Sequence, residues 1–176
     1  MKKNFFSLDS LPARATDFFR VVRANLDKNN CYPLYVQFII TFKCNLSCKY
    51  CDYPSMIADE LSTEDIFKMI DELASGGMRK ISIVGGEPLL RSDLSQIVEY
   101  VKMKNIFCNI ITNGVLFEEK VIDLKNIDLV IFSLDGDEKT HNFNTANGVF
   151  QKVMNGIKLC KKYNIPLFLD ACRFAE

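Results

Sequence analysis

The sequence predicts an α/β protein built as an open, partial (β/α) barrel of about five parallel strands, preceded by an N-terminal helix. Short apolar runs alternate with segments whose apolar residues recur at helical spacing, which is typical of βαβ units and a parallel sheet. The chain has 176 residues. A closed eight-stranded barrel typically needs about 250 residues, so we expect the barrel to stay open.

We expect residues 1–33 to form an N-terminal helix and linker, and residues 34–176 to form the core domain. Ser10 can cap a helix that runs to about Leu26, because Leu11, Phe18 and Val22 fall on one apolar face. Residues 27–33 read as a linker. The first strand is expected at 34–40, where apolar side chains alternate between the two faces.

The next elements follow from periodicity and from end signals. A helix opens at Ser62, with Asp65 completing a box-like cap, and it ends at Gly76-Gly77. The apolar run 80–84 predicts a buried strand. The remaining expected helices are 92–104, 118–125 and 147–163, and the remaining expected strands are 106–111, 129–134 and 167–169.

Composition narrows the class of protein. Hydrophobic residues make up 48% and charged residues 25%, as in an ordinary globular domain. Lys+Arg 22 and Asp+Glu 22 cancel, which argues against a general nucleic-acid or anionic-membrane binder. No signal-peptide pattern or apolar run long enough to span a bilayer is present. The seven cysteines are an odd number and do not read as a secreted disulfide framework, so we expect a cytoplasmic protein.

Three cysteines lie in one loop directly after the first strand. Cys44, Cys48 and Cys51 have the spacing C-x3-C-x2-C. Thiolates are soft ligands for iron–sulfur clusters and zinc. A [4Fe–4S] cluster usually takes four cysteines, so three would leave one iron open. The residues alone leave two other interpretations: a chance grouping, and a structural zinc site with Cys31 as fourth ligand.

The other unusual loops also follow strands. Gly85-Gly86-Glu87-Pro88, Thr112-Asn113-Gly114 and Asp135-Gly136 each follow one, and ligands of parallel sheets bind at the carboxyl ends of the strands. Glycines let the backbone approach a small ligand, and Glu87 could pair with a ligand ammonium. Ser133 and Asp135 share one face of their strand, which suits a ribose diol.

These motifs together resemble the radical S-adenosylmethionine (SAM) superfamily, most closely the branch with peptide-modifying maturases and anaerobic sulfatase-maturing enzymes. The resemblance implies that Cys44, Cys48 and Cys51 hold a [4Fe–4S] cluster whose open iron is chelated by the amino and carboxylate groups of SAM. It also implies a set of SAM-contacting residues: Tyr50, Gly85, Gly86, Glu87, Pro88, Asn113, Ser133 and Asp135.

The implied function is reductive cleavage of SAM to a 5′-deoxyadenosyl radical that takes hydrogen from a substrate. The substrate is not identified, and a peptide side chain is the first hypothesis. An electron donor such as flavodoxin or ferredoxin is expected as a partner, and no catalytic side chain is assigned. Two other classes stay open: a non-catalytic module or fragment that binds the cluster or SAM, and a zinc-stapled interaction domain.

The chain departs from the family pattern in its last third. His141 is followed by Asn142 where that branch often has Asp, and Thr145 or its neighbours stand where an Arg is usual. We interpret His141 as an exposed residue at the approach to a helix. The core is expected to stop before the family's last strand, so that the fifth strand lies at an edge of the sheet.

Overall fold

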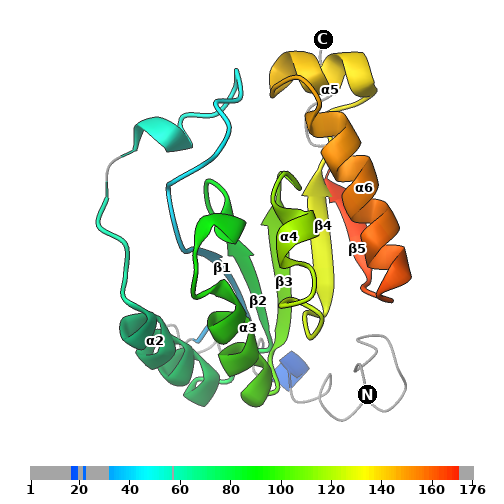
Figure 1. Cartoon of the computed structure of the whole chain (residues 1–176). Coiled ribbons are helices and arrows are strands. Elements are labelled where there is room, and N and C mark those ends of the chain that lie inside the picture. The colour runs from blue at the N-terminus through cyan, green and yellow to red at the C-terminus, as the bar shows by residue number, and fades with distance from the viewer. Residues whose placement is uncertain (1–16, 20–21, 23–31, 57, 171–176) are drawn as a thin grey trace.

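Five parallel strands form a single sheet in the order in which they occur along the chain (Figure 1). The computed structural model describes residues 17–19, 22, 32–56 and 58–170. The strands are β1 (Tyr35–Ile39), β2 (Lys80–Val84), β3 (Phe107–Thr112), β4 (Leu129–Ser133) and β5 (Leu167–Asp170). The predicted open, partial (β/α) barrel is confirmed, and among the described residues β1 and β5 are its edges.

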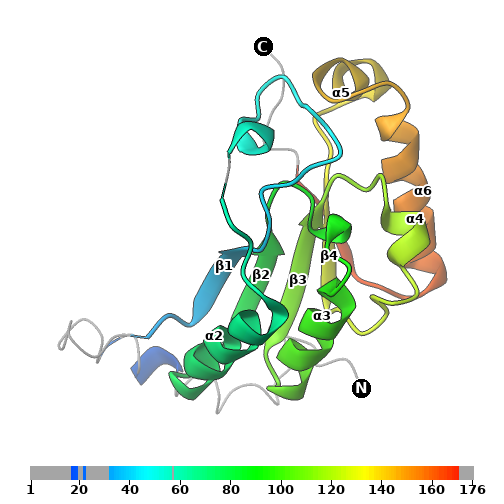
Figure 2. The ribbon, with the colours of Figure 1, turned by 60° about the vertical axis from the view of Figure 1, so that its left-hand side comes forward.

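The main helices lie along one face of this sheet (Figures 1 and 2). They are α2 (Thr63–Ser75), α3 (Leu94–Met103), α4 (Phe117–Lys120) and α6 (Val149–Lys162), each between two consecutive strands. One short helix, α5 (Glu138–Asn144), lies beyond the carboxyl end of β4, near the loop that follows β1. Two 3-10 turns, Tyr53–Ser55 and Pro88–Leu90, complete the described elements.

The core lies between the sheet and these helices. Alternate strand residues point toward the helices and are fully buried, among them Ile81, Ile83, Ile110, Val130 and Phe132. Their helical partners recur at helical spacing: Ile66, Ile70, Ile97, Val98, Val101 and Val153. Each residue of this kind contributes roughly 1.5–3 kcal/mol of transfer free energy on burial. This packing holds the strands, and therefore the loops at their carboxyl ends, in place.

Several predicted end signals are confirmed in detail. The hydroxyl of Ser62 accepts the Asp65 N–H at 3.1 Å, which is the capping contact expected at the start of α2. Asn105 after α3 has φ 58° and Asn164 after α6 has φ 53°, both in the left-handed region that ends helices. The helix expected at 118–125 is wrong in its bounds, because α4 covers only Phe117–Lys120 and gives way to turns.

The sequence did not predict α5. Asp137 caps it, accepting the Thr140 N–H at 2.8 Å. The helix predicted from Ser10 to Leu26 lies mostly outside the described residues, although Asp17, Phe18, Phe19 and Val22 are helical. Most of the predicted linker at 27–33 lies outside them too. No helix in the described ranges has the length and apolar character needed to cross a membrane.

Candidate cofactor site at the carboxyl ends of the strands

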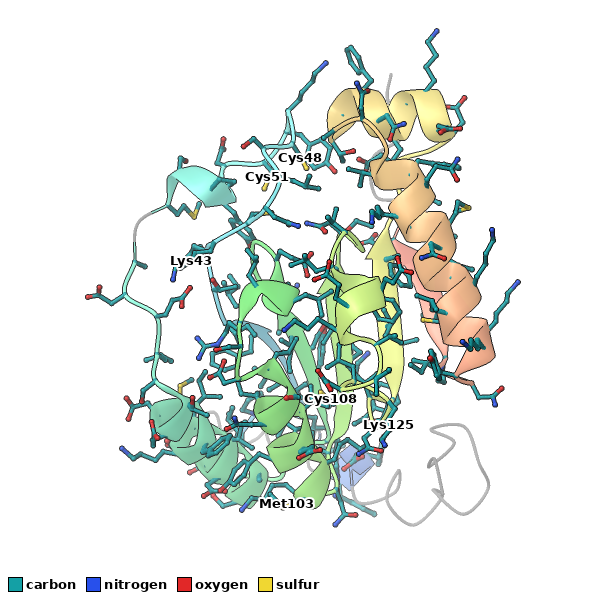
Figure 3. The ribbon with its side chains drawn as sticks, viewed as in Figure 1. Lys43, Cys48, Cys51, Met103, Cys108 and Lys125 are labelled. Carbon is teal, nitrogen blue, oxygen red and sulfur yellow. The ribbon has the colours of Figure 1, made fainter. Side chains whose placement is uncertain are left out.

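The unusual loops meet at one end of the sheet, as the sequence predicts. Figure 3 shows Cys48 and Cys51 beyond the carboxyl end of the sheet, whereas Cys108 lies within the sheet, far from this loop. Hydrogen bonds connect the cysteine loop with the loops after β2, β3 and β4. The site is therefore assembled from four segments that are distant in sequence.

The three cysteines of the loop are free thiols and half-buried. The Cys51 N–H donates to the Cys48 carbonyl at 3.1 Å, which tightens the turn between them. The Cys44 sulfur accepts the Leu46 N–H at 3.4 Å. Among the described residues, no three His, Cys, Asp or Glu side chains converge closely enough to hold one metal ion.

The pKa values of the Cys44 and Cys48 thiols are raised. Partial burial is the main cause for Cys44 and Cys48, and the neighbouring thiols add to it. The pKa of Cys48 reaches about 11. The thiolate form is therefore costly at this site without a compensating positive charge, because the thiolates would repel one another in a partly desolvated loop. A bound metal centre supplies that charge and deprotonates the thiols, so the donor set fits an iron–sulfur cluster.

Glu87 joins the loops after β2 and β3. Its Oε1 accepts the Leu89 N–H at 3.0 Å and the Thr112 hydroxyl at 2.8 Å, and its Oε2 accepts the Asn113 N–H at 2.8 Å. The side chain is fully buried, and this burial raises its pKa to about 7, against the lowering effect of the three donors. The carboxylate thus has a structural role that the sequence did not predict, and its role as a ligand contact stays a prediction.

Gly85 and Gly86 lie against the backbone of the cysteine loop, which leaves no room for a side chain. A Cβ on Gly86 would lie 2.3 Å from the Lys43 carbonyl oxygen, and one on Gly85 would lie 2.3 Å from the Thr41 oxygen. The Lys43 carbonyl accepts the Glu87 N–H at 2.8 Å, and the Thr41 carbonyl accepts the Gly86 N–H at 2.9 Å. The glycines therefore let the loop after β2 lie directly against the start of the cysteine loop.

Asn113 connects the loop after β3 with the cysteine loop. Its side-chain amide donates to the Asn45 side-chain oxygen at 2.8 Å and lies 3.8 Å from the Cys44 sulfur. Its own Oδ1 accepts the Val115 N–H at 3.0 Å, which closes the turn after Asn113. The sequence predicted Asn113 as a ligand contact, whereas its contact with Asn45 was not predicted.

Asp135 contacts the opposite side of the cysteine loop. Its Oδ2 accepts the Tyr50 hydroxyl at 2.7 Å, and its N–H donates to His141 Nδ1 at 3.2 Å. Nδ1 also lies 3.7 Å from Asp135 Oδ2. Burial lowers the pKa of His141, so we interpret the imidazole as neutral. The 3.7 Å between Nδ1 and the Asp135 carboxylate is therefore not an ion pair. Ser133, by contrast, is only half-buried.

His141 is not exposed, so that part of the sequence interpretation is wrong. Its side chain is buried in the middle of α5, where Nδ1 faces the Asp135 N–H just after β4. No local pattern indicated this. The cap at Asp137, with Glu138 in the first turn, was the one signal that could have predicted α5. Cys31, the alternative fourth zinc ligand, lies outside the described residues.

Comparison with known proteins decides the family. A model described as the Radical SAM superfamily matches residues 38–171, which include all of the loops described above. This chain belongs to the radical SAM superfamily. Members of that superfamily are enzymes, and membership implies an iron–sulfur cluster and SAM as cofactors.

Two curated relatives come from Methanococcus maripaludis strains and are named probable GTP 3′,8-cyclase. One is 34% identical over 158 residues, covering 76% of this chain and 53% of the relative. The other is 34% identical over 160 residues, with the same coverage. This chain spans about half the length of the curated relatives it matches.

Solved structures also resemble this chain. Native anSMEcpe with bound AdoMet and Cp18Cys peptide is 27% identical, with a TM-score of 0.66 over 78% of this chain and 42% of that one. SuiB of Streptococcus suis, bound to S-adenosylmethionine, is 19% identical, with a TM-score of 0.74 over 96% of this chain and 41% of that one. The SuiB likeness shows the fold alone.

Proposed function

We propose that this chain is the catalytic core of a radical SAM enzyme that cleaves SAM reductively and transfers a hydrogen atom from a substrate. The observation that carries the proposal is the meeting of the three-thiol loop with the loops after β2, β3 and β4 at one end of the sheet. When bound and reduced, a [4Fe–4S] cluster supplies the electron that splits SAM into methionine and a 5′-deoxyadenosyl radical. We propose a flavodoxin- or ferredoxin-type protein as electron donor.

Cys44, Cys48 and Cys51 are the proposed cluster ligands. They are the three thiols of one loop, free of disulfide bonds and partly accessible. The remaining described cysteines, Cys108 and Cys160, are buried in the hydrophobic core. Three thiolates complete three of the four iron positions and leave one for SAM.

The proposed SAM contacts divide into two groups by what their side chains already do. Glu87 uses three of about four acceptor positions of a carboxylate on the chain's own donors. We assign it first to positioning the Gly85–Pro88 loop, and second to accepting one hydrogen bond from the SAM ammonium. Tyr50 and Asp135 similarly hold each other. Asn113 is held as well, by Asn45 and by the Val115 N–H. Ser133 is half-buried on the strand that ends at this site, which supports direct contact with the cofactor.

A peptide is the substrate class we propose. The support is the resemblance to anSMEcpe, a structure that contains a Cp18Cys peptide as well as AdoMet. A guanine nucleotide is the second candidate, because the Methanococcus maripaludis relatives share 34% identity and are named probable GTP 3′,8-cyclases.

Anaerobic reconstitution followed by SAM cleavage is the decisive experiment. The chain is loaded with iron and sulfide, reduced with a strong chemical reductant and given SAM. We expect about four irons per chain, and equal amounts of methionine and 5′-deoxyadenosine. The Cys48→Ala variant, treated identically, is the matched control and should give neither product.

Other outcomes separate the alternatives. Zinc without sulfide would support the zinc-stapled interaction domain instead. Iron and SAM binding without methionine release would support a non-catalytic module. Deuterium transfer into 5′-deoxyadenosine from a labelled cysteine-containing peptide, compared with labelled GTP, then decides between the two substrate classes.

A further inference from the structure

His141 is the one histidine of the sequence, and only one of its two ring nitrogens has a hydrogen-bond partner. Its side chain is 1% exposed. Nδ1 accepts the Asp135 N–H, so the proton of the neutral ring resides on Nε2. Nε2 is buried and has no hydrogen-bond partner. A buried, unpaired donor destabilises the fold relative to an apolar group of similar size, so stability alone does not account for a histidine here.

The Nδ1 contact is what distinguishes His141 from an apolar residue at this position. It holds the backbone N–H of Asp135 immediately before Gly136, whose φ is 138°. The carboxylate of the same residue accepts the Tyr50 hydroxyl at 2.7 Å. Tyr50 lies between Cys48 and Cys51 in the loop. Two hydrogen bonds, one to the backbone and one to the side chain of Asp135, thus connect His141 with the cysteine loop.

A second contact joins the same two segments. The Lys49 N–H donates to the Asn144 carbonyl at 3.0 Å, and the Lys49 ammonium lies 2.9 Å from the centroid of the Phe143 ring. Asn144 and Phe143 belong to α5, as His141 does. Two adjacent loop residues, Lys49 and Tyr50, are therefore held by one short helix and the turn before it.

We propose that His141 is a positioning residue that fixes the cysteine loop through Asp135 and Tyr50. The assignment of the loop to a cluster rests on the proposed function, but the coupling itself is a property of the apo chain. Removing the Nδ1 acceptor should release Asp135, then Tyr50, and so loosen the segment that carries Cys48 and Cys51.

Amide hydrogen exchange in the apo chain tests this directly. In His141→Leu, amides in the peptide spanning Cys48–Cys51 should exchange about fivefold to tenfold faster, as expected for losing one hydrogen bond in a local opening. His141→Asn places an acceptor oxygen close to the Nδ1 position and should restore slow exchange. Unchanged exchange in His141→Leu would overturn the proposal.

Asn142→Ala is the matched control. The Asn142 side chain accepts the Phe150 N–H at 3.1 Å, so this change removes a contact of α6 without touching Asp135. It should lower global stability while leaving exchange at 48–51 unchanged. If it loosens the loop as much as His141→Leu does, general destabilisation explains the effect and the proposal fails.

A double-mutant cycle shows whether the effect passes through Tyr50. Tyr50→Phe removes the hydroxyl and keeps the ring. If the path is continuous, Tyr50→Phe and His141→Leu together should speed exchange no more than the stronger single change does. Additive effects would contradict the path.

A measurement on the loaded chain completes the test. The half-life of cluster iron against a chelator should fall in His141→Leu and recover in His141→Asn. Should the chain bind no iron at all, the proposed function fails while the exchange result still decides the coupling. Should the chain cleave SAM with unchanged exchange in His141→Leu, only the positioning role fails.

Discussion

The loops after β2 and β3 are held together inside the protein, whereas the cysteine loop after β1 is held mostly from its edges. In the loops after β2 and β3, the fully buried Glu87 carboxylate accepts three hydrogen bonds, from Leu89, Thr112 and Asn113. The three thiols of the cysteine loop are half-buried, and the pKa of Cys48 is raised to about 11 by burial and by the neighbouring thiols. One region is a preformed support, and under the proposed function the other would gain its main stabilising charge from the metal centre it binds.

The two regions take their order from different parts of the molecule. The support loops take their order from the hydrophobic core beneath them, because Ile83, Leu89 and Ile110 are fully buried. The cysteine loop takes its order from contacts at its two ends: backbone bonds to Gly86 and Glu87 near its start, and Asp135 and α5 near Tyr50. Changes in the two regions should therefore have different consequences.

The largest expected effect is loss of the cluster. Cys44→Ala, Cys48→Ala and Cys51→Ala should each abolish the visible absorption of a [4Fe–4S] cluster after anaerobic reconstitution, because one missing thiolate leaves two iron positions open. Cys108→Ala is the matched control. Its thiol is buried in β3, where burial raises its pKa, so this variant should keep the absorption. Retention in Cys48→Ala with loss in Cys108→Ala would reverse the assignment.

The next effect concerns the support region and its pH dependence. The pKa of Glu87 is raised from 4.5 to about 7 by burial, so the folded chain holds this proton more tightly than the unfolded chain. The resulting stabilisation is fully present below pH 4.5 and is lost as pH rises through about 7. Urea unfolding of the apo chain should lose roughly 2–3 kcal/mol of this contribution across that window.

Glu87→Gln removes the titration and should flatten that part of the stability profile. Glu119→Gln, an exposed change on α4, is the control and should leave the wild-type slope intact. An identical pH slope in wild type and Glu87→Gln would show that this carboxyl does not titrate differently in the folded chain.

A third substitution, Gly86→Ala, affects the contact between the loop after β2 and the cysteine loop. The Cβ of Gly86→Ala would lie 2.3 Å from the Lys43 carbonyl oxygen and 2.6 Å from that of Phe42. Both neighbours are backbone atoms, so the cysteine loop has to move, at an expected cost of about 1–3 kcal/mol in unfolding free energy. Iron retention should fall as well.

Gly148→Ala provides the comparison for that change. No atom lies within 4 Å of the added Cβ, and the strain comes only from a φ of 81°, worth about 1–2 kcal/mol. It should lower stability and leave iron retention unaltered. If both glycine changes reduce iron retention equally, the join between the loops has no special role.

The smallest expected effect is at the outer edge of the cysteine loop. Phe143 is 67% exposed, and its ring lies under the Lys49 ammonium. Phe143→Ala should weaken the contact by about 0.5–1 kcal/mol and modestly speed exchange at Lys49. Met103→Ala, at an equally exposed apolar side chain on α3, should leave that exchange unchanged. A larger effect at Met103 would contradict the role of α5.

Much of the architecture was predictable because its causes are local. The strand Lys80–Val84 was predicted to the residue, since a short apolar run between two glycine-rich turns has few other solutions. The cap at Ser62 and the stops at Asn105 and Asn164 depend on neighbouring residues alone. The helix α5 was missed because seven mostly polar residues carry no apolar periodicity.

The sequence by itself determined which loops meet. Strand and helix periodicity, together with the parallel connection of strands, places every loop that follows a strand at the same end of the sheet. The cysteine spacing likewise belongs to one short segment, so the sequence predicted a metal site there, and the resemblance to the family implied a [4Fe–4S] cluster.

Only the tertiary structure decided how those loops hold one another. Tyr50 and Asp135 are 85 residues apart, yet their side chains share a hydrogen bond. Glu87 and His141 are buried because segments distant in sequence cover them. Burial and hydrogen-bond partners are properties of the assembled chain, and no periodicity along the sequence records which polar groups will find each other once the core has formed.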